Sequence, residues 1–169
     1  MIEITHEAAA RAILLAVDEG RIVQGRWHER GRDGRELACL LGAIHPSVKS
    51  PADCNGELMP MWLAELTPAM FDGMAAKHIY PMARRYGELV GRWHTLSPPQ
   101  WDELLTRFLV RTIDAAVDAA RPVSEGKPYW PAVAAACEQT KAALVSGDGL
   151  EAARAAAWAA RAAAWAARA

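Results

Sequence analysis

The spacing of apolar and polar positions predicts a chain built mainly from amphipathic α-helices. Apolar residues recur every three or four positions, the spacing that places side chains on one face of a helix. Short connections between such segments favour a helical bundle of about six to seven helices, so the predicted fold class is all-α. The predicted helices cover approximately residues 6–18, 35–44, 59–66, 81–95, 98–120, 130–145 and 150–169, and a short helical turn is predicted over 67–73.

Capping residues and prolines supply the predicted helix starts. Thr5 is a predicted N-cap, and the string from Asp33 to Glu36 has the pattern of a capping box. Proline is tolerated in the first helical turn, where its missing N–H leaves no bond unmade. Pro60, Pro68 and Pro81 therefore predict three separate helix starts.

Residues 21–35 interrupt the helical pattern and predict a short β-hairpin. An extended segment over Arg21–Trp27 would be followed by a glycine-containing turn and a returning strand. Five arginines face two acidic residues in this segment, which leaves a local excess of three positive charges. The predicted binding residues here are Arg26, Trp27, Arg30 and Arg32.

Three interpretations of this basic, aromatic segment remain open. It could bind nucleic acid, because arginine pairs with phosphates and tryptophan stacks on bases. It could bind an acidic protein surface. It could also be a solvated turn whose charges pair with one another. Gly31, Arg32 and Gly34 could in addition form an anion-binding nest ahead of the helix predicted from Arg35.

The C-terminal segment is an alanine-rich predicted helix with one unusual face. Residues 151–169 contain thirteen alanines, and the larger side chains repeat every seven residues. At about 100° per residue five of them share a wedge of roughly 80°. They are Arg154, Trp158, Arg161, Trp165 and Arg168.

This helix defines a predicted second region, with a boundary between residues 1–147 and 148–169. The tail could pack on its own domain, associate with a second copy or a partner protein, or bind nucleic acid. Its predicted contact residues are Trp158, Arg161 and Trp165. Three arginines on the tryptophan face leave no continuous apolar surface, so no membrane partner is expected.

Composition narrows the function classes only a little. The net charge is −1, so overall charge does not argue for nucleic acid or membranes. Three widely spaced cysteines do not form a disulfide pattern, and the N-terminus lacks a secretory signal. A cytoplasmic location is therefore expected. The abundance of arginine over lysine, and of alanine, indicates a GC-rich bacterial or phage genome.

No recognised catalytic, metal-binding or phosphate-binding motif occurs in the sequence. CxxC, HExxH, GxSxG, GxGxxG and GxxxxGK[ST] are all absent, so neither a cofactor nor a catalytic residue is predicted. One enzymatic hypothesis remains, in which a site assembles from residues distant in sequence. Its candidate residues are Asp53, Asp72, His78, Arg84 and Arg85.

Three strings give the chain a family resemblance. GRELACLLGAIHP (34–46), CNGELMPMWLAELTPAMFD (54–72) and RRYGELVGRWHTL (84–96) resemble a family of uncharacterised proteins from phages and prophages of GC-rich bacteria. The resemblance implies a phage-type accessory protein that binds a host or phage protein complex. Inhibition of a host defence complex, in the manner of anti-CRISPR proteins, would be one form. A nucleic-acid-binding module and the dispersed-site enzyme are the alternatives.

Overall fold

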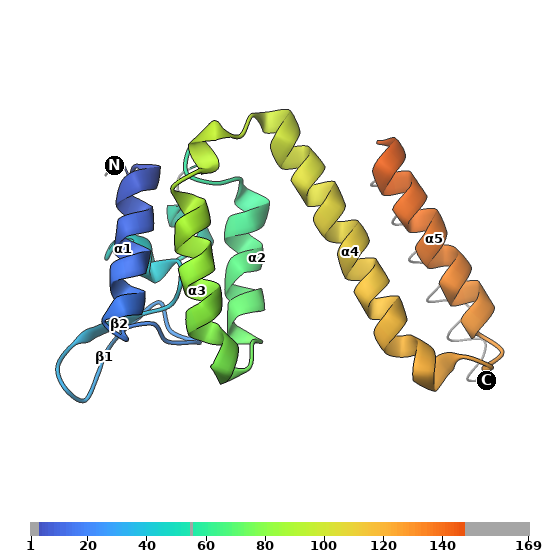
Figure 1. Ribbon diagram of the computed structural model, residues 1–169, viewed down its shortest axis with the longest axis horizontal. Coiled ribbons are helices and arrows are strands. Elements are labelled where there is room, and N and C mark those ends of the chain that lie inside the picture. The colour runs from blue at the N-terminus through green and yellow to red at the C-terminus, as the bar shows by residue number, and fades with distance from the viewer. Residues whose placement is uncertain (1–3, 55, 148–169) are drawn as a thin grey trace. The chain divides into compact units, whose positions relative to one another are not determined.

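The computed structural model describes residues 4–54 and 56–147, and the chain divides into two compact units, residues 1–97 and 98–169. Five α-helices and one two-stranded hairpin occur in the described residues, which confirms the all-α prediction with fewer helices than expected (Figure 1). The predicted boundary at residue 148 borders residues outside the described ranges and stays a prediction. The elements are α1 (His6–Asp18), β1 (His28–Arg30), β2 (Glu36–Ala38), η1 (Gly42–Ile44), η2 (Pro51–Asp53), α2 (Met61–Asp72), α3 (Ala76–Val90), η3 (Trp93–Thr95), α4 (Pro98–Ser124) and α5 (Trp130–Ser146).

Helices α1, α2 and α3 form the framework of the first unit, with α3 between the other two (Figure 1). The hydroxyl of Thr5 accepts a hydrogen bond from the N–H of Ala8, which confirms the predicted cap of α1. Gly20, in the left-handed region with φ of +66°, follows the helix where the sequence predicts its end. The largest side chains that are fully buried in the core are Ile13, Leu40, Leu41, Val48, Leu58, Met59, Thr67, Phe71 and Val90.

A buried polar contact joins α2 to α3. The hydroxyl of Thr67 donates to the carbonyl of Leu63 at 2.7 Å, so Tyr86 must donate its own proton in the 3.0 Å bond between the two hydroxyls. The ring of Tyr86 meets that of Trp93 edge to face, with centroids 5.1 Å apart. Burial raises the pKa of the Tyr86 hydroxyl, so it stays protonated and keeps this bond.

The predicted helix over 35–44 is wrong. Residues 36–38 form strand β2, and only the short 3₁₀ turn η1 lies within the predicted range. The Asp33 carboxylate accepts from the N–H of Arg35, two residues on, and so closes a turn in place of a capping box. Cys39 accordingly follows a strand and does not lie in a helix.

Two predicted helix starts are also wrong, because Pro68 and Pro81 lie inside α2 and α3. Proline inside a helix removes one backbone hydrogen bond and costs about 3 kcal/mol. Phe71 beyond Pro68 and Ile79 before Pro81 are both buried, so their packing on the core side of each helix offsets part of this cost. Residues 61–72 therefore form one helix where the prolines suggest two.

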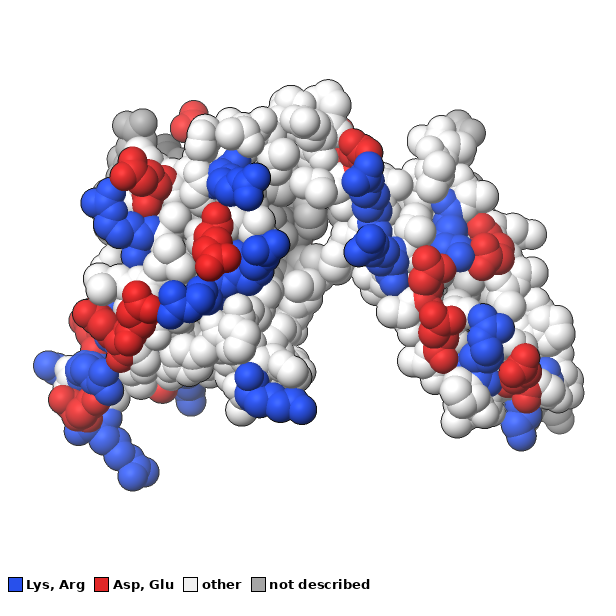
Figure 2. Space-filling model, in the orientation of Figure 1, with Lys and Arg blue, Asp and Glu red and all other residues white. Residues whose placement is uncertain are grey.

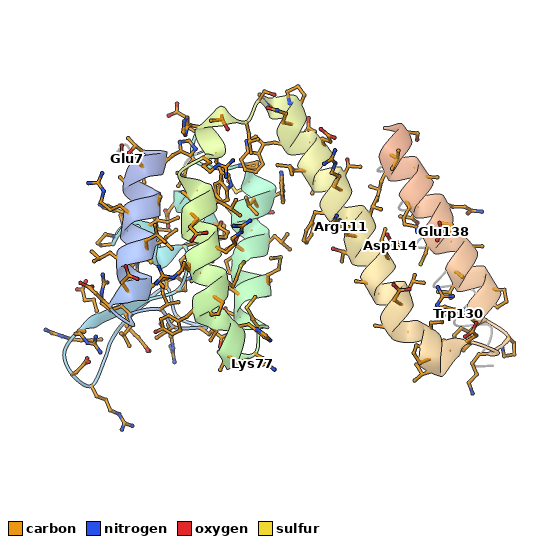
Figure 3. All side chains as sticks on the ribbon, viewed as in Figure 1. Glu7, Lys77, Arg111, Asp114, Trp130 and Glu138 are labelled. Carbon is orange, nitrogen blue, oxygen red and sulfur yellow. The ribbon has the colours of Figure 1, made fainter. Side chains whose placement is uncertain are left out.

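The second unit contains the antiparallel pair α4 and α5 (Figure 1). Lys141 on α5 bonds Asp114 on α4 at 2.6 Å and Glu138 at 2.8 Å; Figure 3 shows both acidic residues. The two hydrogen bonds raise the pKa of Lys141 and keep it charged. None of the helices described here combines the length and apolar composition that crossing a membrane requires.

The pair formed by His6, at the start of α1, and His94, in η3, predicts a loss of stability in mild acid. Burial lowers the pKa of His6 below its ordinary 6.5, nearby His94 acts in the same direction, and a backbone bond at Leu58 partly opposes both. The unfolded chain therefore binds the proton more readily. We expect the free energy of unfolding to be highest above pH 6.5. It should fall as the pH drops from 6.5 through the lowered pKa of His6. Urea unfolding at pH 7.5 and pH 5 would measure this.

His6→Gln supplies the control for this prediction. The variant should lose part of the difference in unfolding free energy between the two pH values. An equal difference in wild type and variant would assign the pH dependence to other groups.

Candidate functional site

The predicted binding residues on the hairpin follow a segment that is fixed to the end of α2. The side-chain amide of Gln24 donates to the carbonyls of Phe71 at 2.6 Å and Met74 at 2.9 Å. The N–H of Gly25 donates to the carboxylate of Asp72 at 2.8 Å. Gln24 thereby bonds one carbonyl at the end of α2 and one just beyond it. The backbone that enters Arg26 is held in place by these bonds.

The backbone of Arg26 and Trp27 is fixed from a second side. The N–H of Cys39 lies 3.0 Å from the carbonyl oxygen of Arg26 and 3.2 Å from that of Trp27, and it donates to both. Gly42 lies so close to Trp27 that an added Cβ would be 2.2 Å from the same Trp27 oxygen. The side chain of Trp27 is half-buried. Arg26 and Trp27 are thus presented by a rigid backbone.

The hairpin predicted within 21–35 exists, but its strands lie further along the chain. Strands β1 and β2 pair antiparallel, with His28 opposite Ala38 and Arg30 opposite Glu36. Ile22 forms a parallel bridge to Ala38, so the expected extended segment is present beside β2. The ring Nε2 of His28 hydrogen-bonds the carbonyl of Val48 at 2.8 Å, which attaches the hairpin to the following loop.

The turn between the strands does not form the anion nest that the sequence suggested. The N–H of Gly31 donates to the carbonyl of Arg35, and the N–H of Gly34 donates to that of Gly31. No helix starts at Arg35, so no helix N-terminus faces this turn. The Arg35 guanidinium beside Asp33 lowers the pKa of that carboxyl and keeps it ionised.

The five arginines of the segment fall into two groups. Arg21 pairs with Glu19 at 2.5 Å, and Arg35 pairs with Asp33 at 2.6 Å. The guanidinium of Arg30 donates to the Gly34 carbonyl at 3.3 Å. Within the part of the chain that the structure describes, the guanidinium groups of Arg26 and Arg32 are exposed and form no hydrogen bond or ion pair.

Acidic residues are interspersed among these arginines on the molecular surface (Figure 2). A surface hollow of about 350 Å³ is lined by both signs of charge: His28, Glu29, Arg30, Glu36, Pro46 and Lys49. A second, of about 530 Å³, is lined by Glu19, Arg21, Arg35 and Glu36. The hairpin is therefore a surface of mixed charge from which two free guanidinium groups extend.

The predicted contact residues of the tail, Trp158, Arg161 and Trp165, lie outside the described residues. They stay predictions. Among the predicted binding residues that the structure describes, all four lie in the single segment 26–32, on β1 and its two flanks.

Four of the five residues in the dispersed enzyme hypothesis pair with another group of the protein through their side chains, and the fifth, His78, is exposed. Asp53 accepts from the N–H of Lys49 and the hydroxyl of Ser50, and these bonds lower the pKa of its carboxyl. Asp72 anchors Gly25 as described above. The other three lie on α3, where Arg84 pairs with Asp18 across to α1, Arg85 lies 3.7 Å from Glu88, and His78 is exposed. None of the five lines either hollow beside the hairpin.

The described residues contain no group of three or more His, Cys, Asp or Glu side chains that could hold a metal ion. Cys39 and Cys54 are both buried, and burial raises the pKa of each thiol, to about 11 for Cys54. The thiolate is the reactive form, so these two positions are poor nucleophiles at neutral pH.

We expect one fast thiol in the native protein. Cys137 is half-buried, whereas Cys39 and Cys54 are 7% and 3% exposed. A maleimide at pH 7.5 should modify Cys137 first and reach the other two only after denaturation, as peptide mass spectrometry would show. Equal modification of all three in the folded protein would contradict the buried positions of Cys39 and Cys54.

Comparisons with protein-family models, curated proteins and solved structures found no match to this chain.

Proposed function

We propose that this chain is a non-enzymatic accessory protein that binds another protein through the hairpin surface formed by Arg26, Trp27, Arg30 and Arg32. The observation that carries the proposal is the exposure of the guanidinium groups of Arg26 and Arg32. Both guanidinium groups are exposed and have no partner among residues 4–54 and 56–147, although acidic residues lie nearby in the sequence. Bonds to Gln24, Gly25 and Cys39 fix the backbone before β1, which lowers the entropy cost of binding there.

The mixed charge of the hairpin favours a protein partner over nucleic acid. Glu29 and Glu36 line the same hollow as Arg30, and Asp33 lies in the turn. Carboxylates at this spacing would repel a phosphate backbone, which carries a charge at every nucleotide. A protein surface can instead offer carboxylates to the free arginines and amides or cations to the glutamates. Trp27 and the arginines belong to the residue types that anchor protein interfaces.

In a phage or prophage setting, we propose that the partner is a protein complex of the bacterial host, and that binding inhibits a defence complex. The sequence resemblance in residues 34–46, 54–72 and 84–96 supports this form of the proposal. The partner would carry an acidic patch whose carboxylates pair with the guanidinium groups of Arg26 and Arg32.

The double variant Arg26→Ala/Arg32→Ala should bind its partner at least tenfold more weakly than wild type, equivalent to about 1.4 kcal/mol. Affinity capture from a lysate of GC-rich bacterial cells, with quantitative mass spectrometry, would identify the partner. Titration of the purified partner would then measure the loss. The matched control is Lys77→Ala/Arg92→Ala, which removes the same net charge from exposed positions outside the hairpin.

Three results would contradict the proposal. The hairpin variant and the control could retain the partner equally, which would place the contact elsewhere. The wild-type protein could capture no partner in stoichiometric amount. Capture could also depend on nucleic acid, with loss after nuclease treatment and a steep dependence on salt, which would favour the nucleic-acid module.

A further inference from the structure

The hydrogen bonds at the two ends of the hairpin show which way the backbone groups of β1 point. The N–H of Gly31 donates to the carbonyl of Arg35, and the N–H of Cys39 donates to that of Trp27. Both pairs continue the register of β1 and β2, so they are hydrogen-bonded positions of this ladder. In an antiparallel ladder such positions alternate with positions whose N–H and C=O point away from the partner strand. The bonded position between the two pairs is Glu29.

His28 and Arg30 therefore direct their N–H and C=O groups away from β2, to the outer edge of β1. The alternation agrees with Ala38, opposite His28, whose N–H and carbonyl bond Arg21 and Val23 on the far side of β2. Within the part of the chain that the structure describes, no hydrogen bond satisfies the outward backbone groups of His28 and Arg30. Arg30 is also exposed, so this edge is a template for another extended chain.

Charge argues against a second copy of this chain as the occupant of the edge. In the two-fold antiparallel register that uses the outward groups of both His28 and Arg30, the Glu29 side chains of the two copies lie directly opposite each other. Like charges at directly opposite positions destabilise a sheet. Arg30 of each copy would face His28 of the other, which supplies no carboxylate. A different chain is therefore the better occupant.

The side chains beside the edge favour an acidic segment. His28, Arg30 and Glu36 share one face of the hairpin, and together with Lys49 they line the hollow of about 350 Å³. Neither Arg30 nor Lys49 forms an ion pair within the described ranges. An added strand would lie next to β1, with Glu36 one strand further away. Carboxylates of that strand on this face could pair with the two cations, whereas the position opposite Glu29 lies on the other face and suits an uncharged side chain.

We propose that β1 accepts an extended acidic segment of a partner protein as an added antiparallel strand, bonded to the outward backbone groups of His28 and Arg30. This inference rests on the proposed protein-binding function and specifies the form of the partner. Strand addition takes its affinity from main-chain hydrogen bonds and its specificity from alternate side chains. The bonds that fix Gln24 and Gly25 hold the chain that enters β1, so little ordering is needed on binding.

A synthetic peptide of alternating glutamate and valine, blocked at both ends, is the probe for this edge. Amide exchange of the full-length protein, followed by NMR, should show at least tenfold protection of the His28 and Arg30 N–H groups when the peptide is bound. The N–H of Glu29 already faces β2 and should change little. The same peptide methylated on its glutamate nitrogens is the control, because it keeps every charge but loses the N–H groups that would pair with β1.

Two variants at one position separate the backbone from the side chain. Arg30→Pro removes the outward N–H and leaves the bonds to β2, since proline is tolerated at the free edge of a strand. Arg30→Ala removes the same guanidinium but keeps the N–H. We expect Arg30→Pro to bind the peptide at least tenfold more weakly than Arg30→Ala. Slow maleimide labelling of Cys39 and Cys54 in both variants would show that the first unit remains folded.

Several results would overturn the added strand. They are the absence of peptide-dependent protection at His28 and Arg30 in the wild-type protein, equal binding of the methylated peptide, and equal affinity of the two folded variants. A wild-type dimer by light scattering, with these two N–H groups protected before peptide is added, would assign the edge to a second copy. If a captured partner depends on Arg26 and Arg32 but binds Arg30→Pro and Arg30→Ala equally, the proposed function stands and the added strand fails.

Discussion

Replacing Gly42 by alanine is expected to reduce the free energy of unfolding of the first unit by about 3 kcal/mol. The added Cβ would lie 2.2 Å from the carbonyl oxygen of Trp27 and 3.1 Å from its carbonyl carbon. Both atoms belong to the backbone, so no side-chain rotation relieves the contact. The segment must move away, which breaks the bonds from the N–H of Cys39 to Arg26 and Trp27.

Chemical denaturation monitored by circular dichroism would measure this loss. Gly56→Ala is the matched control, since an added Cβ at Gly56 meets nothing within 4 Å. It should change the free energy of unfolding by less than about 0.5 kcal/mol. Equal stability of Gly42→Ala and wild type would mean that the backbones of Gly42 and Trp27 are not packed as described. Under the proposed function, the variant should also bind the proposed partner more weakly, because Arg26 and Trp27 lose their fixed backbone.

The hairpin shows how far local sequence patterns reach. Glycine, arginine and β-branched residues around Ile22 correctly indicated extended chain and a turn within residues 21–35. The register was not predictable, because Ile22 pairs with Ala38 in parallel while β1 pairs with the same strand from the other side. The pattern from Asp33 to Glu36 fits both a capping box and a hairpin turn. Residues 36–38 form a strand because they pair with β1 on one side and with Ile22 on the other.

The anchoring of the site could not have been read from the sequence. Gln24 and Gly25 contact carbonyl and carboxylate oxygens of residues 71–74, nearly fifty positions away. Gln24 has no motif around it, and its role depends on where α2 ends in space. Asp72 is a candidate of the dispersed enzyme hypothesis, but its carboxylate accepts the N–H of Gly25. The sequence did indicate the exposed arginines, because their number exceeds that of the nearby acids.

Helix boundaries near the prolines also depend on tertiary contacts that the sequence pattern does not show. Thr67-Pro68 has the local chemistry of a helix start, and the hydroxyl of Thr67 instead bonds the carbonyl of Leu63 one turn earlier. That bond and the contact with Tyr86 hold Thr67 in the core of a continuous helix. Start signals identified from single residues are thus reliable where no tertiary contact competes, as at Thr5, and fail where buried side chains lie on both sides.

Replacing Gly87 by leucine is expected to cost about 3 kcal/mol, because α1 and α3 approach closely at this glycine. An added Cβ alone would lie 3.0 Å from Ile13 and 3.1 Å from Leu14, and Ile13 is fully buried. Leucine is the better helix former by about 0.8 kcal/mol, which offsets only part of the strain. The two helices would have to separate and expose the seam between them.

The neighbouring position supplies the control for this test. Glu88 lies on the solvent side of α3, so Glu88→Leu adds a similar side chain without entering the seam. Its ion pair with Arg85, at 3.7 Å between exposed groups, contributes little to stability. Urea unfolding of both variants should therefore show a loss of stability in Gly87→Leu and almost none in Glu88→Leu. Similar midpoints for the two variants would show that the seam between α1 and α3 tolerates extra volume, and the close packing of these helices would then not hold the first unit together.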